Sequence, residues 1–318
     1  MGSVALFVPH VGCPQQCSFC DQRAITGGAQ PPTPWQVWQT AQAAASHLGQ
    51  QVKETEIAFF GGSFTAIPRG QMLSLLAPAK EAVERFGFRG LRCSTRPDAI
   101  DGEVLRRNRR GHSPEDTVRA AGLIRAAGLE LGLQMMTGLY GSTPEKDVET
   151  ARALIALQPA TARVYPTVVL EGTHLAALYR QGHYHPQTLE EAVALCARLL
   201  PLFEEAGVRV IRVGLHAQED VERRRVAGPY HPAFRELVES RRFLARLLPE
   251  LEKQPPGAYA VRVCPRQLSV ATGQRRCNLE ALARRGYAVR FAPDASLAPG
   301  RFGVGPQETR NEKGKQAQ

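Results

Sequence analysis

Apolar and polar positions along the chain form two recurring patterns. Short apolar runs rich in β-branched and aromatic residues predict strands, and longer segments with helical periodicity predict helices. Up to residue 213 the two kinds of element alternate, which is typical of a parallel α/β architecture. The predicted strands occupy residues 4–8, 56–60, 91–94, 131–136, 161–165 and 208–213. The predicted helices occupy residues 34–48, 71–86, 115–127, 142–157 and 189–206.

The alternation breaks between residues 101 and 114. This stretch has no β-branched or aromatic run, and the next helix already begins at Ser113 and Pro114, where serine is a favoured N-cap. We therefore expect one interior helix–strand unit to be missing, with no strand between residues 101 and 114. Successive parallel strands need a crossover of a dozen or more residues, and this stretch is long enough for such a connection but supplies no strand. The strands predicted at 91–94 and 131–136 must therefore pair with each other or leave a gap in the sheet.

The pattern changes after residue 216. A helix is predicted over residues 233–248, followed by a break at residues 255–257. A small basic unit follows, with strands at 258–264 and 287–291, a short segment at 269–273 and a helix at 276–285. We therefore predict three parts: an α/β domain at 1–216, a C-terminal helical and small α+β region at 217–306, and a disordered polar tail at 307–318.

Composition excludes several classes of protein. The chain has 318 residues, 43% of them hydrophobic, so a large core can form. No apolar run is long enough to span a membrane, and no basic stretch precedes a long apolar region as in a secretory signal. Seven cysteines without an export signal favour a reducing compartment. We expect a cytoplasmic protein with no membrane partner.

The formal net charge of +10 has two interpretations. Only six of the 40 basic residues are lysines, so a GC-rich genome that favours arginine codons would explain the excess. A polyanionic partner such as RNA would explain it equally well. Basic residues are densest at 106–110, 223–225 and 275–276. Charge alone leaves both interpretations open.

The strongest chemical signal is the spacing of Cys13, Cys17 and Cys20. These residues follow directly on the first predicted strand, on a loop punctuated by Gly12 and Pro14. Three thiolates can hold three irons of a four-iron, four-sulfur cluster and leave the fourth iron open to a ligand. The alternatives are a zinc site completed by His10, or inert thiols. Zinc ligands are usually split into two separated pairs, and no second pair stands nearby, so the pattern favours iron–sulfur.

This spacing, with the aromatic Phe19 before the last cysteine, resembles the signature of radical S-adenosylmethionine enzymes. The neighbouring sequence resembles one branch of that superfamily, related to the radical domain of the Elongator catalytic subunit. The similarity covers roughly the first two thirds of the chain. It includes residues 7–10, 20–22, 25–27, 61–65, 94–98, 109–112, 134–139, 165–167 and 212–215.

The resemblance implies a fold and a set of ligands. The fold is a partial (βα) barrel of the radical S-adenosylmethionine type, here with one unit missing and a small α+β C-terminal appendage. The cofactors are a 4Fe-4S cluster and S-adenosylmethionine. Cys13, Cys17 and Cys20 would bind the iron. The other implied cofactor-binding residues are Phe19 beside the cluster, Gly61, Gly62 and Ser63 at the methionyl group, and Gln134, Met136 and Tyr165 in the cavity wall.

The resemblance also implies a reaction. The reduced cluster would cleave S-adenosylmethionine, and the resulting 5′-deoxyadenosyl radical would abstract hydrogen from a substrate. An electron donor such as flavodoxin or ferredoxin would be a partner, and tRNA or another RNA is the candidate substrate. No catalytic residue is assigned. Two alternatives remain: a non-catalytic RNA-binding protein with a structural cluster, and a deletion variant that is impaired as an enzyme.

A second motif stands at the start of the last predicted helix, over residues 273–276. Its sequence, Gly273-Gln274-Arg275-Arg276, resembles the loop with which some RNA-binding modules hold phosphates, although it lacks their second glycine. We predict weak, salt-sensitive RNA binding centred on Arg275 and Arg276.

Overall fold

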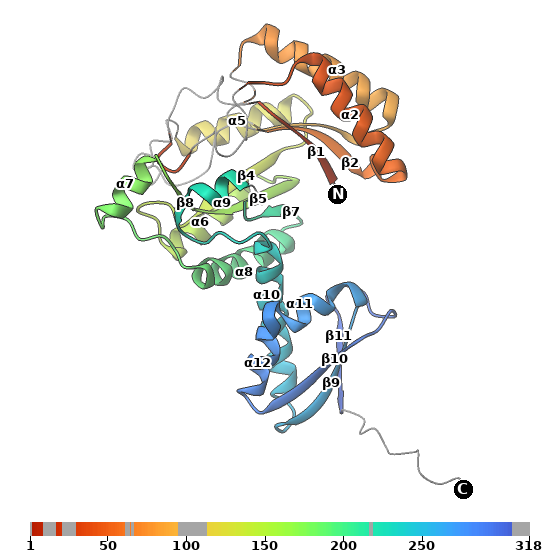
Figure 1. Ribbon diagram of the computed structural model, residues 1–318, viewed down its shortest axis with the longest axis vertical. Coiled ribbons are helices and arrows are strands. Elements are labelled where there is room, and N and C mark those ends of the chain that lie inside the picture. The colour runs from red at the N-terminus through yellow and green to blue at the C-terminus, as the bar shows by residue number, and fades with distance from the viewer. Residues whose placement is uncertain are drawn as a thin grey trace. The chain divides into compact units, whose positions relative to one another are not determined.

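The computed structural model describes residues 2–8, 17–20, 30–60, 64, 67–94, 113–215 and 219–306, which form two compact units (Figure 1). Unit 1 consists of Met1–Ala192 and Leu199–Pro232, and unit 2 of Val193–Arg198 and Ala233–Gln318. Unit 1 extends beyond residue 216 because the strand β8 (Arg225–Ala227) pairs with β6 (Val169–Leu170). The polar tail predicted to be disordered lies outside the described residues.

The first sheet of unit 1 holds three parallel strands in the order β1-β2-β3. They are β1 (Gly2–Phe7), β2 (Thr55–Phe60) and β3 (Gly90–Cys93). The helices α2 (Pro34–Leu48) and α3 (Arg69–Phe86) cover one face of this sheet (Figure 1), and the 3-10 helix η1 (Gly49–Glu54) leads into β2. Ile57 and Phe59 are completely buried in the core that these helices share.

The second sheet also holds three parallel strands, in the order β4-β5-β7. They are β4 (Gly132–Thr137), β5 (Thr161–Pro166) and β7 (Arg209–Val213). The helices of this half are α5 (Pro114–Ala126), α6 (Pro144–Ala156) and α8 (Leu189–Glu205). Thr33 and Ser113 cap α2 and α5 with reciprocal side-chain bonds, which confirms both predicted helix starts.

The α/β class with parallel strands is confirmed, and the described strands do not form a closed barrel. In the part of the chain that the structure describes, β3 and β4 are not paired. Leu91 and Cys93 of β3 are exposed, although their register partners Ile57 and Phe59 are completely buried. The face of β3 that carries Leu91 and Cys93 is therefore only partly packed against other residues. The segment predicted to have lost a helix–strand unit, residues 101–114, lies almost wholly outside the described residues.

Side chains join the two sheets of unit 1 where backbone pairing does not. Arg163 of β5 donates from Nη2 to Ser94 Oγ beyond β3, at 3.0 Å, and its guanidinium lies 5.2 Å from the centre of the Phe60 ring. On the same side, Glu56 of β2 forms an ion pair with Arg92 of β3. Burial lowers the pKa of Arg92 from its usual value, while the charge of Glu56 raises it.

Several short elements were not predicted. The helix α7 (His174–Arg180), capped by Thr173, occupies what the sequence suggested was a loop. The strands β6 and β8 have two and three residues, too few to show a periodic pattern. The helix α9 (Glu219–Arg224) is also short, and it precedes β8 directly. These elements depend on long-range contacts and capping, so local sequence alone gives little signal for them.

Unit 2 consists mainly of one long helix, two short helices and a three-stranded sheet. The long helix is α10 (Phe234–Leu251). The strands β9 (Gly257–Val263) and β10 (Tyr287–Pro293) are parallel neighbours, and β11 (Phe302–Pro306) runs antiparallel on the other edge of β9. The short helices α11 (Leu268–Thr272) and α12 (Cys277–Ala283) connect β9 to β10. β11 was missed because its two glycines and its proline have low strand propensity.

A buried carboxylate fixes the loop that follows β4. Asp147, on the first turn of α6, is 3% exposed and accepts hydrogen bonds from Gly138 N at 2.8 Å and Ser142 Oγ at 2.6 Å. Gly138 has a φ of +67°, a left-handed conformation that glycine adopts more readily than other residues. Burial raises the pKa of Asp147 to about 6, against the opposing effect of the two hydrogen bonds.

Asp147 should make stability depend on pH. The folded protein holds this proton more tightly than the unfolded chain, so the free energy of unfolding should fall as pH rises from about 4 to above 6. The expected loss is about 3 kcal/mol. In Asp147→Asn, this part of the pH dependence should disappear.

Urea denaturation between pH 4 and pH 7 measures the effect as a difference between wild type and variant. The exposed Glu149 lies two residues further along the same helix, so Glu149→Gln is the matched control and should keep the wild-type slope. Equal slopes for wild type and Asp147→Asn would contradict the assignment.

Candidate functional site

The described part of the cysteine loop is a tight turn buried in unit 1. Cys17 is 7% exposed, Ser18 is completely buried, and Cys20 is half-buried. Cys20 N donates to Cys17 O at 3.1 Å, and Ser18 O accepts from Leu175 N of α7 at 2.7 Å. The turn is therefore held by its own backbone and by the start of α7. Cys13, the third predicted iron ligand, lies outside the described residues, as does His10 of the zinc alternative.

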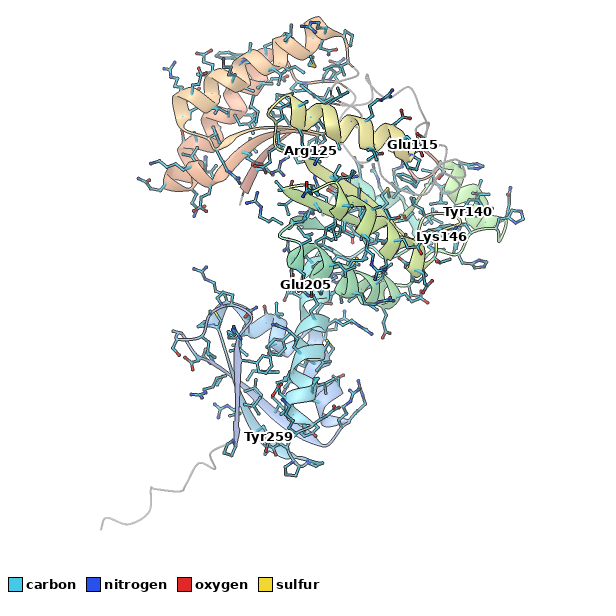
Figure 2. The ribbon with its side chains drawn as sticks, turned by 180° about the vertical axis from the view of Figure 1, so that it is seen from behind. Glu115, Arg125, Tyr140, Lys146, Glu205 and Tyr259 are labelled. Carbon is cyan, nitrogen blue, oxygen red and sulfur yellow. The ribbon has the colours of Figure 1, made fainter. Side chains whose placement is uncertain are left out.

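An apolar cluster surrounds this turn, which we call the cysteine-loop cluster. Its buried members are Cys17, Phe19, Leu139, Val169, Leu175, Ala176 and Tyr184. Cys20, Met136 and Tyr140, among others, pack against it, and Tyr140 is labelled in Figure 2. The hydroxyl of Tyr184 donates to Gly138 O at 2.7 Å. The cluster thus links the cysteine turn to the loop that Asp147 fixes.

The predicted cavity-wall residues share one face of the second sheet. Met136 of β4 is the register partner of Tyr165 on β5, and Gln134 is the partner of Arg163. Since alternate residues of a strand point to the same side, all four lie on one face. Met136 also packs against the cysteine-loop cluster, so the structure brings it together with Cys17 and Phe19. The binding roles of these residues remain predictions.

The predicted methionyl-binding residues, Gly61, Gly62 and Ser63, lie outside the described residues. The residues on either side of them are described. Phe60 O accepts from Val8 N at 2.7 Å, and Phe64 N donates to Ser94 O at 3.0 Å. The segment therefore leaves from the carboxyl end of β2, between the ends of β1 and β3.

Arg163 lies on the same sheet face as the predicted cavity-wall residues, and the sequence reasoning missed it. Its guanidinium reaches the ring of Phe60, the residue before Gly61, and the hydroxyl of Ser94. The signal was present in the sequence, because Arg163 stands two positions before Tyr165 and must share its face. Arginine binds carboxylates with paired hydrogen bonds, so this side chain brings an anion-binding group to the predicted cofactor face.

The described residues include some, but not all, of the side chains predicted to bind an iron–sulfur cluster. Among them, no group of three or more histidine, cysteine, aspartate or glutamate side chains is placed to hold a metal ion. They include Cys17 and Cys20, two of the three predicted thiolate ligands, on one hydrogen-bonded turn. Thiol ligands set in apolar surroundings fit an iron–sulfur cluster, whose solvent exposure the protein must control.

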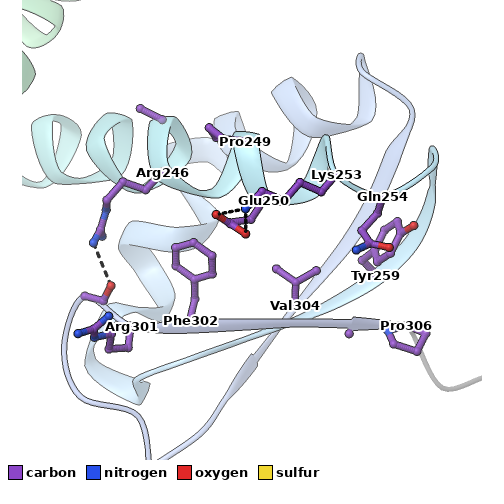
Figure 3. Close-up of a pocket in the computed structure, with 13 residues that line it drawn as sticks. Arg246, Pro249, Glu250, Lys253, Gln254, Tyr259, Arg301, Phe302, Val304 and Pro306 are labelled. Atoms are coloured by element: carbon purple, nitrogen blue, oxygen red, sulfur yellow. Dashed lines mark hydrogen bonds and ion pairs between the residues drawn. The ribbon is translucent and has the colours of Figure 1, made fainter.

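Unit 2 contains a separate groove of about 870 Å³ between α10 and β11 (Figure 3). Charged side chains line it, but Arg246 donates to Gly300 O at 2.9 Å and Lys253 pairs with Glu250 at 2.7 Å. Phe302 and Val304 form its apolar wall. None of the predicted cofactor residues contributes to this groove. In the portions of the chain that are described, no helix is long and apolar enough to cross a membrane.

A family model described as the Radical_SAM C-terminal domain matches residues 159–243. This match starts just before β5 and reaches into α10. It includes Arg163 and Tyr165 and lies C-terminal to the cysteine motif, so the two signals are independent.

Three relatives show the sequence similarity. The tRNA uridine(34) acetyltransferase of Methanocaldococcus infernus is 34% identical over 98 residues, which is 30% of this chain and 18% of the relative. That of Dehalococcoides mccartyi is 26% identical over 269 residues, 66% of this chain and 58% of the relative. Human Elongator complex protein 3 is 26% identical over 238 residues, 61% of this chain and 43% of the relative. The chain thus spans much less than the full length of these relatives.

The Dehalococcoides alignment has a further feature. The alignment extends over 269 residues but covers only 66% of this 318-residue chain, so it is longer than the part of the chain that it matches. The relative therefore has residues within the aligned region that this chain lacks.

The structure of the archaeal Methanocaldococcus infernus Elp3 with an N-terminal deletion (1–46) shows the same fold. It is 21% identical, has a TM-score of 0.57, and covers 79% of this chain and 62% of that chain. The resemblance inferred from the cysteine motif is confirmed: the chain is similar to radical S-adenosylmethionine proteins, in a branch similar to the Elongator catalytic subunit.

Proposed function

We propose that this protein is an iron–sulfur enzyme that cleaves S-adenosylmethionine to abstract hydrogen from a substrate. The observation that carries the proposal is the apolar cluster that includes Cys17 and Phe19 and against which Met136 packs, at the carboxyl end of β4. In α/β barrels, catalytic groups gather at this end of the strands. Cys13, Cys17 and Cys20 would hold a cluster whose chemistry, when bound and reduced, would be one-electron cleavage of S-adenosylmethionine.

Cys13, Cys17 and Cys20 would hold three irons of the cluster. The apolar cysteine-loop cluster, with Phe19 and Leu139, would keep water away from it. Water exclusion suits this reaction, because solvent would quench a reactive intermediate. Asp147 supports the arrangement indirectly, since it fixes the loop that carries Leu139 and Tyr140.

The methionyl end of S-adenosylmethionine would lie at Gly61, Gly62 and Ser63. Arg163 is suited to pair with its carboxylate, because the guanidinium already lies beside Phe60, at the start of that segment. Gln134, Met136 and Tyr165 would form the wall of the same cavity, on the sheet face that carries Arg163.

RNA is the proposed substrate class, and tRNA its first candidate. The support comes from the relatives, which include proteins named tRNA uridine(34) acetyltransferase, and from the net charge of +10. The proposed electron donor is a flavodoxin or a ferredoxin. The proposed location is the cytoplasm, where reducing conditions suit the cysteines.

Two alternative functions differ in a measurable way. A non-catalytic RNA-binding protein would hold a cluster without cleaving S-adenosylmethionine. An impaired deletion variant would cleave it slowly. Formation of 5′-deoxyadenosine from S-adenosylmethionine by the reduced protein separates the two.

Changing Cys17 to alanine should remove the cluster. After anaerobic reconstitution, wild type should show about four irons and a brown chromophore, as a cysteine-held four-iron cluster requires. Cys17→Ala should lose both. Cys93→Ala removes an exposed thiol outside the motif and serves as control. Unchanged iron in Cys17→Ala, or zinc in place of iron in wild type, would rule out the assignment.

Arg163→Gln should weaken binding of S-adenosylmethionine without loss of iron. The lost charge-assisted hydrogen bonds correspond to about 1.5–3 kcal/mol, or at least about tenfold in affinity. Equilibrium dialysis on reconstituted protein measures this directly. Arg152→Gln removes an exposed arginine on α6, and as the control it should bind like wild type. Equal affinity of Arg163→Gln and wild type would show that Arg163 does not touch the cofactor.

The chain should take up iron normally but turn over slowly. The cysteine loop follows β1 and does not depend on the missing unit, whereas that unit would normally contribute side chains to the cofactor face. We expect normal iron content, with 5′-deoxyadenosine formed far more slowly than by a relative that retains the unit. Equal rates for the two reconstituted proteins would contradict this.

A further inference from the structure

The loop at residues 273–276 joins two short helices between parallel strands. β9, α11, α12 and β10 follow in order, and β9 and β10 are neighbours in the sheet. The loop is Gly273-Gln274-Arg275-Arg276. Single-stranded RNA is held in one class of RNA-binding module by a Gly-x-x-Gly loop that clamps the backbone of four nucleotides. The chain has the first glycine of that pattern and an arginine in place of the second.

Three residues of this loop have positive φ angles, which glycine adopts more readily than any other residue. Gly273 has a φ of +77°, and a Cβ there would lie 2.6 Å from Cys277 Sγ, so no other residue fits. Arg275 and Arg276 have φ angles of 51° and 65°, in the left-handed region that side chains disfavour. Arg276 thus adopts a glycine-like conformation at the position of the second glycine. Strain of this kind persists where the surroundings enforce it, often at functional sites.

A buried asparagine supports the loop. Asn278 is 3% exposed, and its Nδ2 lies within hydrogen-bond distance of Ala271 O at 3.0 Å and Ser240 Oγ at 3.0 Å. These contacts tie the start of α12 to α11 and α10. The loop is therefore held in a fixed shape, which lowers the entropy cost of binding a ligand.

The side chains of Arg275 and Arg276 are accessible and could bind an anion. Both side chains are exposed, and within the described residues neither forms an ion pair. Residues 257–306 contain eight arginines, two acidic residues and no lysine or histidine, a formal net charge of +6. Of the two acidic residues, Asp294 already lies 3.8 Å from Arg262. The loop thus projects two cations from a strongly basic unit.

We propose that residues 273–276 form a phosphate clamp for single-stranded RNA, with Arg275 and Arg276 contacting the backbone. This site lies in unit 2 and is distinct from the cofactor site of unit 1. It would recognise the phosphate backbone and not base identity, because the described loop offers cations and main-chain groups. RNA binding here requires neither a reduced cluster nor S-adenosylmethionine, so it can fail or succeed independently of the proposed radical chemistry.

Binding of the full-length chain to labelled oligouridine, followed by fluorescence anisotropy at increasing salt, tests the proposal. Arg275→Ala with Arg276→Ala should weaken binding about tenfold at low salt and reduce the slope of log K against log salt by about 1.4. The matched control is Arg284→Ala with Arg285→Ala, which removes the same charge from the end of α12 and should change affinity by less than about twofold.

Arg276→Gly separates lost contacts from misfolding. Glycine accepts the left-handed backbone, so this variant should melt at the wild-type temperature or higher while binding RNA more weakly. The proposal is overturned if the loop variant binds like wild type or if the control loses as much affinity. Binding to anionic lipid vesicles with no binding to oligouridine would also overturn it.

Discussion

Unit 1, as far as the structure describes it, contains two parallel sheets that must be held together without backbone hydrogen bonds between them. In the described residues, the two parallel sheets share no ladder of hydrogen bonds between β3 and β4, so side chains must hold the halves together. Arg163 does this at the carboxyl ends of the strands through Ser94 and Phe60. Near the opposite ends, Glu130 lies 3.9 Å from both Arg89 and Arg209. Among the described residues, contacts of charged side chains thus join the two sheets where backbone pairing does not.

The sequence predicts unit 1 well where periodicity is strong. Its six main strands and five main helices follow from apolar runs and caps, and the spacing of the three cysteines favours an iron–sulfur cluster over a zinc site. The Arg163 side chain shows where such reasoning stops. Strand alternation places it on the correct face, but its contacts with Ser94 and Phe60 join strands far apart in the chain. The pairing of β6 with β8 is equally non-local.

Unit 2 shows a different limit of sequence reasoning. The motif at 273–276 is visible in the sequence, yet the left-handed angles of Arg275 and Arg276 are not, because these residues rarely adopt them. The conformation follows from the surrounding contacts, with Gly273 packed against α12 and Asn278 bonded to α10 and α11. A loop that departs from the usual glycine pattern can therefore keep the usual shape.

The open side of β3 also has a consequence for association between molecules. An unpaired strand edge presents backbone donors and acceptors to any extended segment of another chain, which makes it a template for polymerisation. In the described residues β3 is the edge strand of its sheet and has only four residues, and this short length limits such growth. An edge of this length offers a partner strand only a few backbone groups, so it is a poorer template for polymerisation than a long strand would be.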